Sequence, residues 1–236
     1  MLHCARRQWT LATLFFTLAG FFRSNNIFLG GFIIWDLVIV PFLKSHKLQL
    51  RSLLQTTCYV TSIFAPFIYH QYSAYSLFCI GQPDNNPEWC NRSLPLIYTH
   101  VQSKYWNVGL FRYWTPAQLP NFLLAAPTLA TILAFAYHHL HSLFIQIQRQ
   151  QKARAAPFAH ESLTPHVLHS VFMSGLLLFA SHTQITLRLA ASMPVLYWAG
   201  TWLVVEHPQC AALWVAWSFL WGTISILLWS SFLPPA

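Results

Sequence analysis

Charged residues are scarce in this sequence, and acids are the scarcest: 5 of 236 residues are Asp or Glu. Charged residues make up 8% of the chain in total, whereas a soluble domain has about a quarter. Hydrophobic residues make up 56%, and the mean hydropathy is +0.44. Because so few charges cannot cover an ordinary water-facing surface, most of the surface must face lipid. The composition therefore predicts an all-α, polytopic membrane protein.

The sequence also lacks the motifs of common metal and nucleotide sites. It contains no HExxH pattern and no Gly-rich phosphate loop. Histidines gather at 138–141 and 166–169, but without the acidic or thiolate neighbours that a metal site needs. The formal net charge of +8 comes from short clusters beside apolar runs, which favours anionic lipid surfaces over nucleic acid. We therefore expect no metal, no cofactor and no nucleic-acid partner.

Apolar runs predict six helical spans in one membrane domain covering residues 1–236. The runs approach or exceed the length needed to cross the hydrocarbon layer, and membrane helices tolerate prolines such as Pro66 and Pro127. A polar stretch at 181–188 interrupts the fifth run. The predicted spans are residues 9–22, 27–43, 53–78, 122–147, 167–190 and 211–233.

Lysines and arginines predict the orientation of these spans. Three basic clusters lie at 6–7, 44–51 and 149–154, and short basic loops stay in the cytosol. Six spans then place both termini in the cytosol and a loop at about 79–120 in the lumen. In this topology His138 lies toward the cytosolic end of span four, whereas Glu206 lies in a second, shorter lumenal connection.

The predicted lumenal loop contains features of the secretory pathway. Cys79 and Cys90 flank a polar segment, and Asn91-Arg92-Ser93 is an N-glycosylation sequon. We expect a Cys79–Cys90 disulfide, with Cys210 as the competing partner on the same predicted side. Asn91 is the candidate glycosylation site.

The segment "KYWNVGLFRYW", at 104–114, mixes aromatic rings with cationic and amide side chains. Aromatic residues collect where membranes meet water, so the segment fits an interfacial belt. It equally fits a pocket for a phosphorylated or glycosylated lipid, because cations bind phosphate, amides bind hydroxyls and rings stack on sugars. Composition leaves both interpretations open. The candidate substrate-binding residues here are Gln102, Lys104, Tyr105, Trp106, Asn107 and Arg112.

Two further polar patches lie at predicted lumenal span ends, and a third lies at 23–26. Gln184 and Arg188 are four residues apart and would share a helix face. An arginine at a span end also fits simple snorkelling to the interface, so a structural role for Arg188 stays open. The additional candidate substrate-binding residues are Gln71, Tyr72, His182, Gln184 and Arg188.

A long motif then supplies a resemblance. The stretch "LPLIYTHVQSKYWNVGLFRYWTPAQLPNFLLAAP", at 94–127, resembles the signature of the GPI mannosyltransferase 2 family of the PIG-V type. Supporting similarities are "FRSNNIFLGGF", "YHQYSAYSLFC", "HTQITLRLAASMPVLYWAG" and the terminal "FLPPA". The resemblance covers essentially the whole chain.

This resemblance implies a multispanning glycosyltransferase of the endoplasmic reticulum membrane with the GT-C architecture. The implied reaction adds the second mannose, in an α-1,6 linkage, to a GPI precursor on the lumenal face. The implied donor substrate is dolichol phosphate mannose, and a cation beside its phosphate would stabilise the leaving group. The resemblance to fungal members also implies a small membrane subunit as a possible partner.

One departure from the family concerns the acidic residues. Full-length relatives have a further N-terminal portion with a Trp-Asp pair, and nothing here matches it. A sugar hydroxyl needs a general base, usually a carboxylate, and none of the five acids present is well placed by sequence. We therefore expect the chain to resemble the C-terminal half of such an enzyme, with its catalytic residue unassigned. A non-catalytic membrane subunit is the alternative, and a transporter ranks third. The acids considered are Asp36, Asp84, Glu88, Glu161 and Glu206.

Overall fold

The computed structural model describes residues 2–80, 87–148 and 158–231, and within these ranges every regular element is a helix. This confirms the all-α prediction. The chain divides into two compact units, Met1–Trp106 and Asn107–Ala236, which are described separately below. Asp84, the basic cluster at 149–154 and the terminal segment 232–236 lie outside the described residues.

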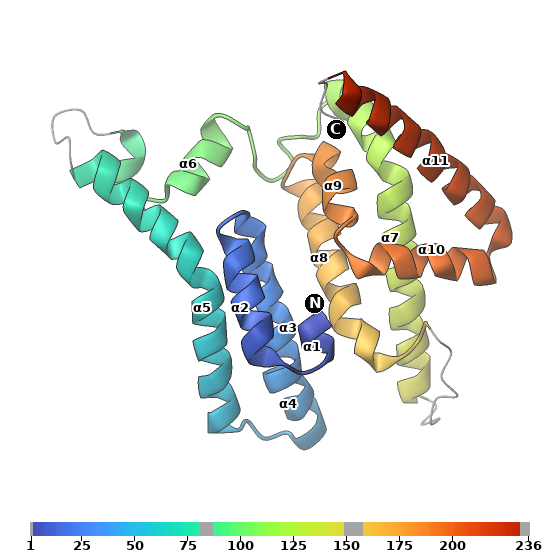
Figure 1. The fold of residues 1–236 in the computed structure, drawn as a ribbon, viewed down its shortest axis with the longest axis horizontal. Coiled ribbons are helices and arrows are strands. Elements are labelled where there is room, and N and C mark those ends of the chain that lie inside the picture. The colour runs from blue at the N-terminus through green and yellow to red at the C-terminus, as the bar shows by residue number, and fades with distance from the viewer. Residues whose placement is uncertain (1, 81–86, 149–157, 232–236) are drawn as a thin grey trace. The chain divides into compact units, whose positions relative to one another are not determined.

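The first unit is built on the long helix α5, against which α2 and α3 pack (Figure 1). Its core contains Phe16, Phe32 and Ile63. Gly20 allows α2 to approach α5 closely, because a Cβ at this position would lie 3.2 Å from Pro66 Cγ. The elements are α1 (Leu2–Ala5), α2 (Trp9–Gly20), η1 (Ser24–Leu29), α3 (Gly30–Ile34), η2 (Trp35–Ile39), α4 (Val40–Ser45), α5 (Leu50–Tyr75), η3 (Ser76–Ile80), η5 (Glu88–Asn91) and α6 (Ile97–Lys104).

The second unit is built on α7, which contacts α8, α9 and α10, while α11 packs on α10 (Figure 1). Phe135, Val167 and Trp202 belong to its core, and the rings of Phe135 and Trp202 lie 6.0 Å apart. The elements are η6 (Pro116–Gln118), α7 (Leu119–Gln148), η7 (Glu161–Leu163), α8 (Thr164–Phe179), η8 (Thr183–Ile185), α9 (Thr186–Ala190), α10 (Pro194–Glu206) and α11 (Pro208–Ser230).

Four helical stretches in the described residues are long and apolar enough to cross a membrane. They overlap predicted spans two, four, five and six, and the shorter apolar helix Trp9–Gly20 overlaps the first. Predicted span three corresponds to α5, a helix of 26 residues whose glutamines and hydroxyl side chains lower its hydropathy. The count of six spans stays a prediction. The four stretches are Ser24–Ser45, Pro116–Gln148, Glu161–Phe179 and Pro208–Ser230.

The predicted fifth span at 167–190 is not one helix: its polar stretch at 181–188 forms separate short elements. Helix α8 ends at Phe179, where the Thr183 hydroxyl donates to the Leu177 carbonyl at 3.0 Å. A short 3-10 turn and α9 follow. Pro194 then begins α10, a 13-residue helix in a segment expected to be a connection. Proline suits the first turn of a helix because the missing N–H is not needed there.

Helix α10 also corrects the predicted topology. Glu206 Oε2 lies 3.7 Å from His138 Nε2 and accepts a hydrogen bond from Trp202 Nε1 at 2.7 Å. His138 lies roughly 28 Å along α7 from Leu119, at a rise of about 1.5 Å per residue. The predicted topology puts Glu206 in a lumenal connection and His138 toward the cytosolic end of span four. Two side chains in contact cannot lie on opposite sides of a membrane. At least one of those two placements is therefore wrong.

Candidate functional site

The aromatic signature at 104–114 crosses the boundary between the two units. Trp106 ends the first unit and Asn107 begins the second. Asn107 has a φ of 49°, in the left-handed region that asparagine tolerates better than most residues. The backbone conformation therefore explains an asparagine at this position without any substrate contact.

In the first unit the structure brings together three segments that the sequence marked as polar. The Tyr98 backbone N–H donates to Gln71 Oε1 at 3.1 Å, and the Ser24 hydroxyl donates to the Tyr98 hydroxyl at 2.9 Å. The Phe67 ring packs edge-on against Tyr98, with 5.7 Å between centroids. Helix α6, which carries Gln102 and Lys104, is thus tied to both α5 and η1.

Two buried amide side chains of this unit have unused hydrogen-bonding atoms. Gln71 is 6% exposed and Asn26 is 4% exposed. Gln71 Nε2 and Asn26 Oδ1 have no partner among the described residues, although Asn26 Nδ2 donates to the Phe16 carbonyl. An unsatisfied buried polar atom costs about 1–3 kcal/mol, so native proteins keep few of them. We call Ser24, Asn26, Gln71 and Tyr98, which come from η1, α5 and α6, the amide cluster; Ser24, Tyr98 and Gln71 are bonded in series, and Asn26 lies in η1 with Ser24.

The remaining candidates of the first unit lie on its surface. Lys104 is exposed in the last turn of α6, where a cation also stabilises the helix dipole. Tyr72, Tyr105 and Trp106 are 66%, 71% and 58% exposed, which is compatible with both an interfacial belt and a substrate platform. Gln102 is half-buried on α6.

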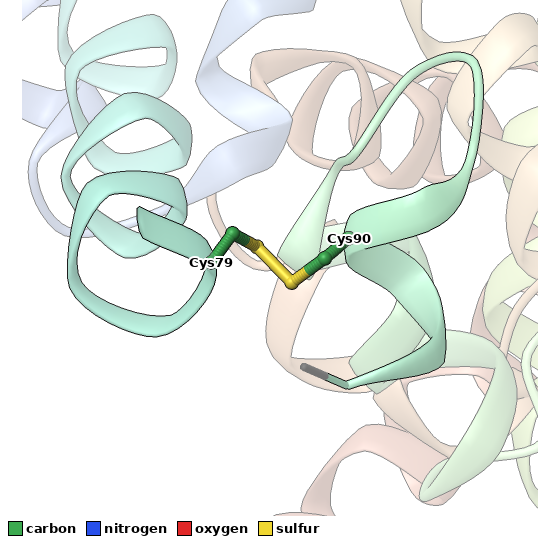
Figure 2. The surroundings of a disulfide bond; sticks show 2 residues. All are labelled: Cys79 and Cys90. Atoms are coloured by element: carbon green, nitrogen blue, oxygen red, sulfur yellow. A yellow bond between two sulfur atoms is a disulfide. The ribbon is translucent and has the colours of Figure 1, made fainter. Parts of the chain in front are cut away.

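A disulfide joins Cys79 and Cys90, with their Cα atoms 5.6 Å apart (Figure 2). The bond links η3 to η5, and the neighbouring Trp89 is buried, with its ring 6.4 Å from that of His100. Cys210, the competing partner by sequence, is free and exposed in the second unit. Asn91 is exposed immediately after the bridged Cys90.

In the second unit, backbone and indole bonds fasten the signature to the end of α8. The Phe111 N–H donates to the Phe179 carbonyl at 2.7 Å, and Trp114 Nε1 donates to the Leu178 carbonyl at 2.7 Å. These bonds satisfy carbonyls that a helix end leaves free. Phe111 has a φ of 57°, which is costly for a bulky residue and needs such support. Trp114 therefore has a structural role in this unit.

Next to this anchor is a group of paired polar side chains. Asn121 Nδ2 donates to the Tyr113 hydroxyl at 2.8 Å and to Gln118 Oε1 at 2.7 Å. The ring of His182 lies 4.7 Å from that of Tyr113, and burial raises the pKa of the Tyr113 hydroxyl. The sequence candidates included His182 but neither Gln118 nor Asn121. The sequence signal for these two residues is a pair of amide side chains three residues apart near the start of a helix.

The other candidates of this unit lie near the same elements. The Arg112 side chain is exposed and runs past Gly109, where an added Cβ would lie 2.8 Å from Arg112 Cδ. Gln184 is half-buried in η8 and Arg188 is exposed in α9. The predicted helical pair therefore lies on two consecutive short elements.

None of the described acidic residues lies on an element that carries either group. Asp36 lies in η2 within an apolar stretch, and Glu88 and Glu161 are exposed in 3-10 turns. Glu206 pairs with Trp202. Within the described ranges, no group of three or more His, Cys, Asp or Glu residues is placed to hold a metal ion.

Comparison with known proteins identifies the family. The model of the family described as Mannosyltransferase (PIG-V) matches residues 1–236. GPI mannosyltransferase 2 of Cryptococcus neoformans var. neoformans serotype D (strain JEC21) is 33% identical over 98% of this chain and 60% of its own length.

Other relatives give the same picture. GPI mannosyltransferase 2 of Schizosaccharomyces pombe is 33% identical over 98% of this chain and 48% of its own length. GPI alpha-1,6-mannosyltransferase 2 of Cricetulus griseus is 32% identical over 81% of this chain and 46% of its own length. The chain thus spans about half the length of these relatives, and no solved structure matches it. By its match over the full length, the chain belongs to the mannosyltransferase (PIG-V) family.

Proposed function

We propose that this protein acts in GPI-anchor biosynthesis as an α-1,6-mannosyltransferase of the endoplasmic reticulum membrane. The observation that carries the proposal is the family match over residues 1–236, together with relatives named for this transfer. The proposed donor is dolichol phosphate mannose, the proposed acceptor is the GPI precursor with one mannose, and the proposed site faces the lumen.

The chemistry of the first unit supports a role in holding a sugar lipid. The free atoms of the amide cluster offer one donor, Gln71 Nε2, and one acceptor, Asn26 Oδ1. A sugar hydroxyl both donates and accepts, so it can satisfy atoms of both kinds. Exposed Lys104 supplies a cation of the kind that stabilises a departing phosphate.

In the proposed transfer, an acceptor hydroxyl attacks the anomeric carbon of the donor mannose, and the lipid phosphate leaves with the bonding electron pair. The acceptor proton passes to a general base. We assign that base to none of the described acids, because Asp36 lies within an apolar stretch and the others lie in turns or pair with Trp202.

Complementation tests the proposal. Cells lacking GPI mannosyltransferase 2 would receive either this chain or a chimera extended with the part of the S. pombe relative that this chain does not match. We expect the chimera to restore GPI-anchored proteins at the cell surface. Failure of both forms, with normal membrane expression, would contradict the proposal.

A second candidate function is a non-catalytic subunit that binds the glycolipid. It is favoured by the lack of an assigned base among the described acids. In isolated membranes, binding of the lipid donor without transfer by either form would support it. A small membrane subunit is a further proposed partner, and co-purification from detergent extracts would detect it.

A further inference from the structure

The sequon at 91–93 is accessible in the folded chain. Asn91 ends the short 3-10 helix η5, and Arg92 follows in an extended conformation, with φ −78° and ψ 154°. All three sequon residues, Asn91, Arg92 and Ser93, are exposed. A glycan on Asn91 would therefore project from the surface without displacing a packed side chain.

The residues just before Asn91 are held firmly. Cys90 is bonded to Cys79, and Trp89 is 3% exposed. The Cys90 N–H donates to the Pro87 carbonyl at 2.9 Å, and the Arg92 N–H donates to the Trp89 carbonyl at 3.4 Å. Figure 2 shows the disulfide joining Cys90 of η5 to Cys79 of η3, the short helix that directly follows α5. The disulfide and the buried indole therefore restrict the backbone beside Asn91.

We propose that Asn91 is an N-glycan acceptor whose modification competes with closure of the Cys79–Cys90 disulfide. A glycosyl-transferring enzyme must take both the asparagine amide and the Ser93 hydroxyl into its own site. It can do so readily while the segment is open. After closure, the fixed backbone of Trp89 and Cys90 restricts that access. This proposal does not need the mannosyl transfer itself, but it rests on the proposed lumenal side of the segment that carries Asn91.

The two reactions have different co-reactants. In glycosylation, a bond forms between Asn91 Nδ2 and the first sugar carbon of a lipid-diphosphate-linked oligosaccharide. The carbon–oxygen bond to the diphosphate breaks, the diphosphate takes the electron pair, and Nδ2 loses one proton. In closure, the two thiols lose two protons and two electrons to the disulfide of a protein oxidant, which becomes a dithiol.

The test measures glycan occupancy by the gel shift that a glycosidase removes. The full chain would be expressed in cells with a secretory pathway as wild type and as the double variant Cys79→Ser/Cys90→Ser. We expect a partly glycosylated wild type and a larger glycosylated fraction in the double variant. Asn91→Gln should abolish the shift, and Cys210→Ser, which removes a free exposed cysteine, is the matched control and should leave the fraction unchanged.

A second measurement avoids dependence on the folding of the variant. Adding a membrane-permeant reductant during synthesis of the wild type should also raise the glycan occupancy of Asn91. Absence of a shift in both wild type and double variant would overturn Asn91 as the acceptor. Equal occupancy in the two, or no response to the reductant, would overturn the competition.

Discussion

The two units differ in how completely the amide side chains discussed above are paired. In the second unit, Asn121 uses its amide N–H groups on Tyr113 and Gln118, and Trp114 bonds to α8. In the first unit, Gln71 and Asn26 are more deeply buried than Asn121, but each retains an atom without a partner among the described residues. Paired groups stabilise a fold, whereas unpaired buried groups cost stability and call for an explanation. In the proposed function that explanation is substrate binding by the amide cluster, while the pairing around Tyr113 is structural.

The largest expected effect is on the proposed phosphate contact. Lys104→Ala in the chimera should lower mannosyl transfer by about 10²-fold or more, the range seen when one charge-stabilising group is removed from an active site. Expression should not change, because Lys104 is exposed. The measurement is accumulation of the one-mannose GPI precursor in the complemented cells. Lys47→Ala, at another exposed lysine, is the control, and equal transfer by both variants would reduce Lys104 to an interfacial residue.

The second prediction concerns the paired group. Asn121→Leu removes the donor to both Tyr113 and Gln118, so we expect it to destabilise the protein by about 1–3 kcal/mol. Thermal unfolding in detergent would measure the loss, and transfer per folded molecule should change little. A normal melting temperature with lost transfer would place Asn121 in the binding site instead.

The third prediction separates the backbone and side-chain roles of Asn107. Glycine adopts the left-handed region freely, so Asn107→Gly should keep stability, whereas Asn107→Ala should lose roughly 1 kcal/mol. If both variants keep transfer, the Asn107 amide is not a substrate ligand. Loss of transfer in the glycine variant despite its normal stability would contradict a purely backbone role.

The smallest expected effect is at the rim of the amide cluster. Tyr98→Phe removes the hydroxyl that accepts from half-buried Ser24, but leaves the bond from the Tyr98 N–H to Gln71. We expect a loss of about 0.5–1.5 kcal/mol in unfolding free energy. Ser24→Ala should give a similar change, and the double variant should add little, since both remove one bond. Fully additive losses would show that the two side chains do not interact.

Part of this structure could be predicted from the sequence, because long apolar runs must form helices in a membrane. The sequence pattern does not predict helix α10, because its apolar segment is short and looks like a connection between spans. The resulting contact between Glu206 and His138 depends on packing, which no local pattern contains. At the candidate site, Gln71 and the segment at 23–26 were marked by residue type alone. Their meeting at Tyr98 depends on how α5, η1 and α6 pack, and so required the structure.

The central claim is that the amide cluster binds substrate, and Gln71→Met tests it most directly. Methionine fills a similar volume, removes the unpaired Nε2 and loses the single bond to the Tyr98 N–H. Mannosyl transfer and melting temperature would be measured together on the chimera. We predict that transfer falls sharply while the melting temperature falls only modestly, because removing the buried unpaired Nε2 offsets part of the cost of leaving the Tyr98 N–H without its acceptor. Transfer at the wild-type level, or a loss of transfer that only follows a fall in melting temperature, would contradict a binding role for the cluster.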